Sequence, residues 1–182
     1  MARVPLPSRE QLSIQLQRRW DRMAARGPIN IQRLFFASPE IDFNVTTSLR
    51  VSGLDVRTRE ILILRCAFLK RSTYEWHQHV RFAREGGLSD HEILEVKLWR
   101  GSDVFSENER GVLAYADVMH EGVRPSDEVF QGLFTGRTVP QVIAVALIVG
   151  HYFALAGLMQ TFDIETEEPF IGWDLAGASE QT

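Results

Sequence analysis

The sequence has very little cysteine, and this excludes several kinds of site. Of its 182 residues, only Cys66 is a cysteine. A single cysteine cannot form a disulfide within the chain, a Cys-x-x-Cys redox pair or a cysteine-rich zinc site. Because Cys66 lies inside an apolar segment, we expect an inert buried thiol there and not a nucleophile.

An excess of positive charge and a long uninterrupted apolar run are also missing. The net charge is −4, whereas a nucleic-acid-binding protein usually carries a basic face or stripe. The first residues contain no apolar stretch like that of a signal peptide. Arg65 interrupts the apolar segment 61–69, and Gln141 and His151 interrupt the segment 139–159. We therefore expect a cytoplasmic protein that binds no nucleic acid and does not span a membrane.

The sequence also lacks the alternation of apolar and polar residues that is typical of strands. It contains helical signals instead. Apolar residues recur at helical spacing behind capping residues. The expected helices cover about 8–25, 31–37, 39–50, 55–70, 72–85, 89–98, 106–120, 126–136 and 140–162. These signals predict an all-α fold, with a single domain over residues 1–165. We expect the acidic tail 166–182 to be mobile or docked on a partner.

The last long helix is apolar around most of its circumference. Such a helix must be covered on all sides, and a chain of this size covers it only in part. The sequence therefore predicts a homo-oligomer.

Glu60 is the first candidate for chemistry, because four large aliphatic residues follow it directly. Burial of this helix would raise the pKa of Glu60 and make it a proton carrier near neutral pH. The alternative is structural: a carboxylate early in a helix favours the helix dipole, and Arg57 or Arg59 pairs with it.

Glu75 and His79 are four residues apart and share one face of a helix. A carboxylate that holds an imidazole sets its tautomer for acid–base chemistry; the alternative is an ordinary surface pair. Glu75, His77, His79 and His151 are also metal-ligating types. However, His77 and His79 point about 200° apart on a helix, so we expect no metal site.

The stretch 59–93 resembles the carboxymuconolactone decarboxylase family. In the related alkylhydroperoxidase D (AhpD) proteins, a glutamate precedes a helix that begins Cys-x-x-Cys-x-x-x-His. An alanine and a glycine follow that histidine at four-residue steps. The matching residues here are Glu60, His79, Ala83 and Gly87. Ser72 and Glu75 occupy the two cysteine positions.

This resemblance implies an AhpD-like helical bundle that assembles as a trimer or hexamer and uses no cofactor. Thiol-dependent peroxide reduction needs one thiolate to attack and a second to resolve, so the resemblance points to the cysteine-free decarboxylase branch. That branch implies general acid–base chemistry on a carboxylated lactone or a similar enolisable compound, by a lyase or a related isomerase or hydrolase.

The resemblance also implies roles for individual residues. His79 is expected to donate the proton, Glu60 to relay it and Glu75 to orient the imidazole. The residues expected to contact the small-molecule substrate are Tyr74, Trp76, His77 and Arg57. Its carboxylate has three alternative partners, which are Arg57, Arg59 and Arg81.

Helix geometry makes the Glu60–His79 pair possible. Glu60 lies about ten residues before the turn at 70–73 and His79 about seven after it, at heights of about 15 and 10 Å. Two antiparallel helices would therefore bring the side chains within reach.

Two rival hypotheses remain open. The first is a non-catalytic, oligomeric member that binds a small molecule or serves as a scaffold. The second is a peroxidase, which requires an exposed Cys66 with a lowered pKa.

Overall fold

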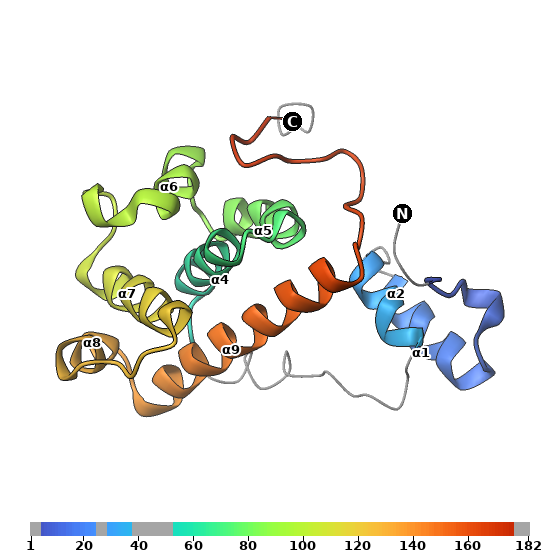
Figure 1. Cartoon of the computed structure of the whole chain (residues 1–182), viewed down its shortest axis with the longest axis horizontal. Helices are drawn as coiled ribbons and strands as arrows, with labels where there is room; N and C mark the ends of the chain where they lie inside the picture. Colours follow the sequence, from blue (N-terminus) through green and yellow to red (C-terminus); the bar gives the residue numbers. More distant parts are fainter. Residues whose placement is uncertain (1–4, 25–28, 38–52, 177–182) are drawn as a thin grey trace.

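The computed structural model describes residues 5–24, 29–37 and 53–176. These residues form eight α-helices and two 3-10 helices and contain no strand, which confirms the all-α prediction (Figure 1). In chain order the elements are η1 (Arg9–Gln11), α1 (Ile14–Ala24), α2 (Asn30–Ala37), α4 (Val56–Lys70), α5 (Thr73–Glu85), α6 (Asp90–Glu95), η2 (Val96–Gly101), α7 (Glu107–Glu121), α8 (Asp127–Leu133) and α9 (Val139–Thr161). The helix expected over 39–50 lies outside the described residues.

Capping residues begin the helices where the sequence predicts. Asp55 accepts a hydrogen bond from the backbone of α4, and Ser72 does the same for α5. Ser106 and Glu109 form the expected capping box of α7, and Gly122, with a φ of 73°, ends that helix. Each such cap satisfies backbone groups that the helix leaves unpaired.

Two expected helices are broken in the structure. Ser8 lies directly before the short η1, and extended backbone at Leu12 separates η1 from α1. The helix that begins after Ser89 ends as α6 and continues as the 3-10 helix η2.

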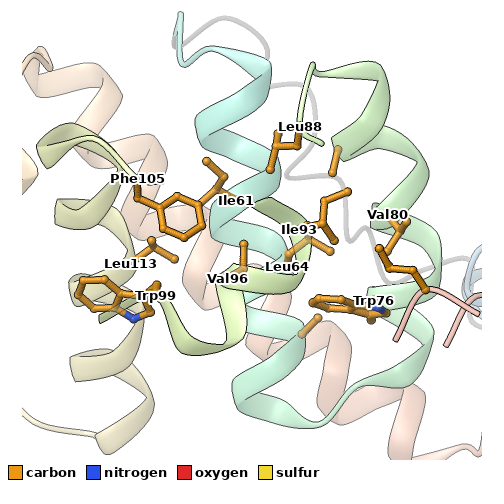
Figure 2. Close-up of a cluster of buried hydrophobic side chains, with 13 residues drawn as sticks. Ile61, Leu64, Trp76, Val80, Leu88, Ile93, Val96, Trp99, Phe105 and Leu113 are labelled. Carbon is orange, nitrogen blue, oxygen red and sulfur yellow. The ribbon is translucent and has the colours of Figure 1, made fainter. Parts of the chain in front are cut away.

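Helix α4 lies at the centre of the molecule, with α5, α7 and α9 packed around it (Figure 1). One buried cluster fills the space between α4, α5, η2 and α7 (Figure 2). Ile61 and Leu64 of α4 are fully buried in this cluster. Burial of such a side chain contributes about 1.5–3 kcal/mol.

Helix α9 has the length and composition of a membrane span, with a mean hydropathy of 2.2. A core helix of a globular protein meets the same criteria. Val145, Ile148 and Val149 of α9 are buried in a second cluster, against Leu62 and Cys66 of α4. We therefore describe α9 as a core helix.

The C-terminal segment (165–176) runs back over α5 (Figure 1). Trp76 donates a hydrogen bond from Nε1 to the carbonyl of Gly172, at 2.9 Å. The indole rings of Trp76 and Trp173 lie 5.0 Å apart. The described part of the expected tail, residues 166–176, therefore docks on its own chain.

Candidate functional site

A tight turn between α4 and α5 brings the two candidate catalytic residues together. Arg71 lies in this turn and adopts a left-handed backbone, with a φ of 54°. The two helices pack against each other. As a result, Oε2 of Glu60 lies 2.7 Å from Nδ1 of His79. The contact expected from helix heights is therefore present.

Glu60 carries two opposing influences on its pKa. It is 1% exposed, between Arg59 and Ile61 of α4. Burial raises its pKa, but the hydrogen bonds and charges of His79 and Arg59 together outweigh burial. The pKa of Glu60 is therefore lowered, and the expected rise is wrong because Glu60 is paired on both oxygens.

The ionised Glu60 fixes how His79 exchanges protons. A carboxylate can only accept, so Nδ1 of His79 is the donor in their hydrogen bond. Proton exchange with a ligand then falls to Nε2. The side chain of His79 is 14% exposed, so the imidazole is shielded but not sealed off.

Tyr152 of α9 is a site residue that the sequence analysis missed. Its ring stands edge-on to His79, with the centroids 5.0 Å apart. Burial raises the pKa of Tyr152, and the charge of Glu60 raises it further, whereas Arg59 opposes them. The tyrosine is therefore a neutral phenol within electrostatic range of Glu60. It lies more than seventy residues from His79 in sequence, so no local pattern points to it.

Glu75 does not orient His79, because Glu60 holds Nδ1 instead. The Glu75 side chain is 2% exposed, and neither of its oxygens has a hydrogen-bond partner among the described residues. Burial raises the pKa of Glu75 well above its ordinary value, and the nearby Ser72 hydroxyl offsets only part of this. Glu75 is therefore a neutral acid that a polar ligand atom would satisfy.

Three of the expected substrate contacts instead hold the C-terminal segment. Tyr74 donates a hydrogen bond to Glu167 at 2.9 Å. Nδ1 of His77 accepts one from the backbone N–H of Ile171 at 3.0 Å. Trp76 is fully buried beneath the same segment. These side chains have structural partners, because the C-terminal segment covers their face of α5.

Arg57, the fourth expected contact, binds two carboxylates of its own chain. Its Nε donates to Glu109 at 2.7 Å and its Nη2 to Glu92 at 2.5 Å. Both acceptors also complete capping boxes, on α7 and α6. Arg57 therefore ties three helix starts together.

Cys66 has none of the features of a reactive thiol. It is fully buried. Burial raises its pKa well above the ordinary value. Among the described residues, no group of three or more His, Cys, Asp or Glu side chains is placed to hold a metal ion.

Comparison with solved structures shows the same fold in proteins of low sequence identity. A peroxidase-related AhpD-core protein from Ralstonia eutropha is 15% identical, with a TM-score of 0.76 over 97% of this chain and 96% of its own. A debrominase solved with 2,3,4-tribromopyrrole is 16% identical, with a TM-score of 0.74 over 98% and 96%. A protein of unknown function from Agrobacterium tumefaciens is 23% identical, with a TM-score of 0.67 over 74% and 95%.

No curated protein matches the sequence. The model of the carboxymuconolactone decarboxylase family matches residues 40–118. This range includes both Glu60 and His79. The resemblance inferred from the motif is therefore confirmed: residues 40–118 carry the signature of the carboxymuconolactone decarboxylase family, on an AhpD-like fold.

Proposed function

We propose that this protein is a small-molecule lyase, or a related isomerase or hydrolase, that uses general acid–base chemistry. Its substrate would be a carboxylated lactone or a similar enolisable compound. The family match and the fold support a small-molecule catalytic or related function in general. The observation that carries the specific proposal is the partly buried hydrogen bond between Glu60 and His79.

In a decarboxylation, the bond between the substrate carbon and its carboxylate breaks and CO₂ departs. The electron pair passes into a conjugated carbonyl as a dienolate. When His79 is an imidazolium, which Glu60 stabilises, its Nε2–H donates a hydrogen bond to the dienolate oxygen. This proton then passes from Nε2 to the substrate carbon, and the neutral imidazole takes a replacement proton from solvent. An isomerase would use the same proton transfers without loss of CO₂.

Tyr152 and Glu75 suit this chemistry because both are neutral hydroxyl donors. Tyr152 is in ring contact with His79, and Glu75 is an acid with unpartnered oxygens. A second donor near a developing oxyanion stabilises its charge more strongly in a shielded site than in water.

The test is a panel of carboxylated lactones incubated with the enzyme in D₂O and followed by proton NMR. The proposal predicts loss of CO₂ or uptake of deuterium at carbon. His79→Ala should abolish it, and Glu60→Gln should reduce it at least about tenfold. The matched control is His91→Ala, since His91 is exposed on α6.

Two outcomes would contradict the proposal. In the first, no compound of the panel reacts with the wild-type enzyme. In the second, both variants retain full activity.

A non-catalytic, oligomeric binding or scaffold protein is the alternative. One observation favours it: Val139, Ile143 and Leu147 of α9 are all exposed. Their four-residue spacing places them on a single stripe, as an assembly surface would require. The NMR experiment separates the two functions, because a scaffold would leave every compound of the panel unchanged.

A further inference from the structure

Three arginines on α4 and α5 differ in the hydrogen bonds and ion pairs that they already make within their own chain. Arg57 uses Nε and Nη2 on two glutamates. Arg81 has a side chain that is 58% exposed and lies 4.0 Å from Glu85, a weak surface pair. Arg57 is therefore not available to a ligand, and Arg81 is not placed at the Glu60–His79 pair.

Within the part of the chain that the structure describes, Arg59 uses only one of its three nitrogens on its own chain, and this nitrogen binds at the candidate site. Its Nε donates to Oε1 of Glu60 at 2.8 Å. Among the described residues its guanidinium has no other hydrogen-bond partner. Nη1 and Nη2 therefore have no such partner, and the edge that they form matches the two oxygens of a carboxylate. The side chain is 29% exposed, so a ligand can reach it from solvent.

Arg59 and His79 flank the same carboxylate. Oε1 of Glu60 binds Arg59 and Oε2 binds His79. Nε of Arg59 and Nδ1 of His79 therefore lie within about 8 Å of each other, the span of two hydrogen bonds and one carboxylate. The guanidinium and the imidazole are thus neighbours at one site. The charge of Arg59 also opposes the rise in the pKa of Tyr152, so the guanidinium lies within electrostatic range of the phenol.

We propose that Arg59 is the residue that selects anionic substrates, by binding a substrate carboxylate through Nη1 and Nη2 while Nε stays on Glu60. This inference rests on the proposed function, because it assigns a specificity residue to the same site. Glu60 then has two tasks: it fixes the tautomer of His79 and the orientation of Arg59. The bound carboxylate would place the rest of a small lactone next to the imidazole.

The test compares the binding of γ-carboxybutenolide with that of its methyl ester, by NMR titration of the intact protein. The wild type should bind the acid at least about tenfold more tightly than the ester, as expected for a charge-assisted bidentate contact. Arg59→Gln should remove this preference. Arg59→Lys should keep part of it, since an ammonium supplies the charge without the paired geometry.

Two controls separate anchoring from an indirect effect. Arg81→Gln removes the same charge from an exposed position of α5 and should keep the full preference. If Arg59 acted solely through Glu60, its loss would weaken acid and ester equally, so the ratio of the two affinities is the informative quantity.

The proposal is overturned if Arg59→Gln keeps the wild-type ratio, or if the wild type shows no preference for the acid. The binding role of Arg59 can be tested separately from catalysis. An Arg59-dependent preference without turnover of any lactone would contradict the proposed function and leave the anchor in place.

Discussion

Nδ1 of His79 lies 2.7 Å from Oε2 of Glu60, although 19 residues separate the two in sequence. Glu75, one turn before His79 on the same helix, has no hydrogen bond to its carboxyl oxygens among the described residues. Two buried glutamates of one site are thus held in opposite states. Glu60 is ionised by its partners, whereas Glu75 is neutral because it is buried without them.

The lowered pKa of Glu60 gives its contribution to stability a definite pH dependence. The contribution is present above the ordinary carboxyl pKa of 4.5 and is lost as the pH falls through the lower folded value. Glu60→Gln should therefore cost about 2 kcal/mol of unfolding free energy at neutral pH. The difference from the wild type should shrink below that pH window. Urea unfolding at a series of pH values measures it, and a pH-independent difference would show that Glu60 is not ionised in the fold.

Glu75 should show the opposite sign. Its folded pKa is raised, so its contribution is complete below 4.5 and is lost as the pH rises towards the folded value. The loss approaches about 1.4 kcal/mol per pH unit. Glu75→Gln should therefore gain stability relative to the wild type between pH 4.5 and neutrality. The same unfolding series tests this, with Glu60→Gln as the matched variant; a constant offset would mean that Glu75 ionises normally.

Cys66 should be chemically silent in the native protein. Because the thiol is fully buried and its pKa is raised, a thiol reagent should react with it only after unfolding. Cys66→Ala should leave any turnover unchanged, and the wild type should not reduce peroxides by a thiol route. Rapid labelling of the native protein, or loss of turnover in a folded variant, would reopen the peroxidase hypothesis.

The exposed stripe on α9 predicts a homo-oligomer. Ile143 is 55% exposed and Leu147 46%, and apolar side chains arranged in this way favour burial against another subunit. Light scattering should return a multiple of 20.8 kDa, and Leu147→Glu should lower the mass. A wild-type monomer at micromolar concentration would refute the prediction.

Much of the fold could be predicted because its signals are local. Ser72, Ser106 and Gly122 fix helix ends through their own backbone contacts. The contact between Glu60 and His79 was also predictable, because one short turn joins their helices. In each case the interacting groups lie within about twenty residues of each other.

The sequence-based predictions failed where segments that are distant in the sequence pack together. Tyr152 reaches His79 from another helix, and the C-terminal segment covers His77 from 94 residues away. The sign of the pKa shift of Glu60 depends on whether His79 and Arg59 together outweigh its burial. Spacing along one helix determines none of these, because they depend on which surfaces pack together.

The docking of the C-terminal segment on α5 has a consequence for biosynthesis. Trp76 is translated 96 residues before its hydrogen-bond acceptor Gly172. Protein synthesis adds about 5–20 residues per second, so this face of α5 stays exposed for roughly 5–20 s before the C-terminal segment is made. During that interval an indole and an imidazole that end up buried are open to chaperones, so the nascent chain presents a binding surface that the finished protein conceals.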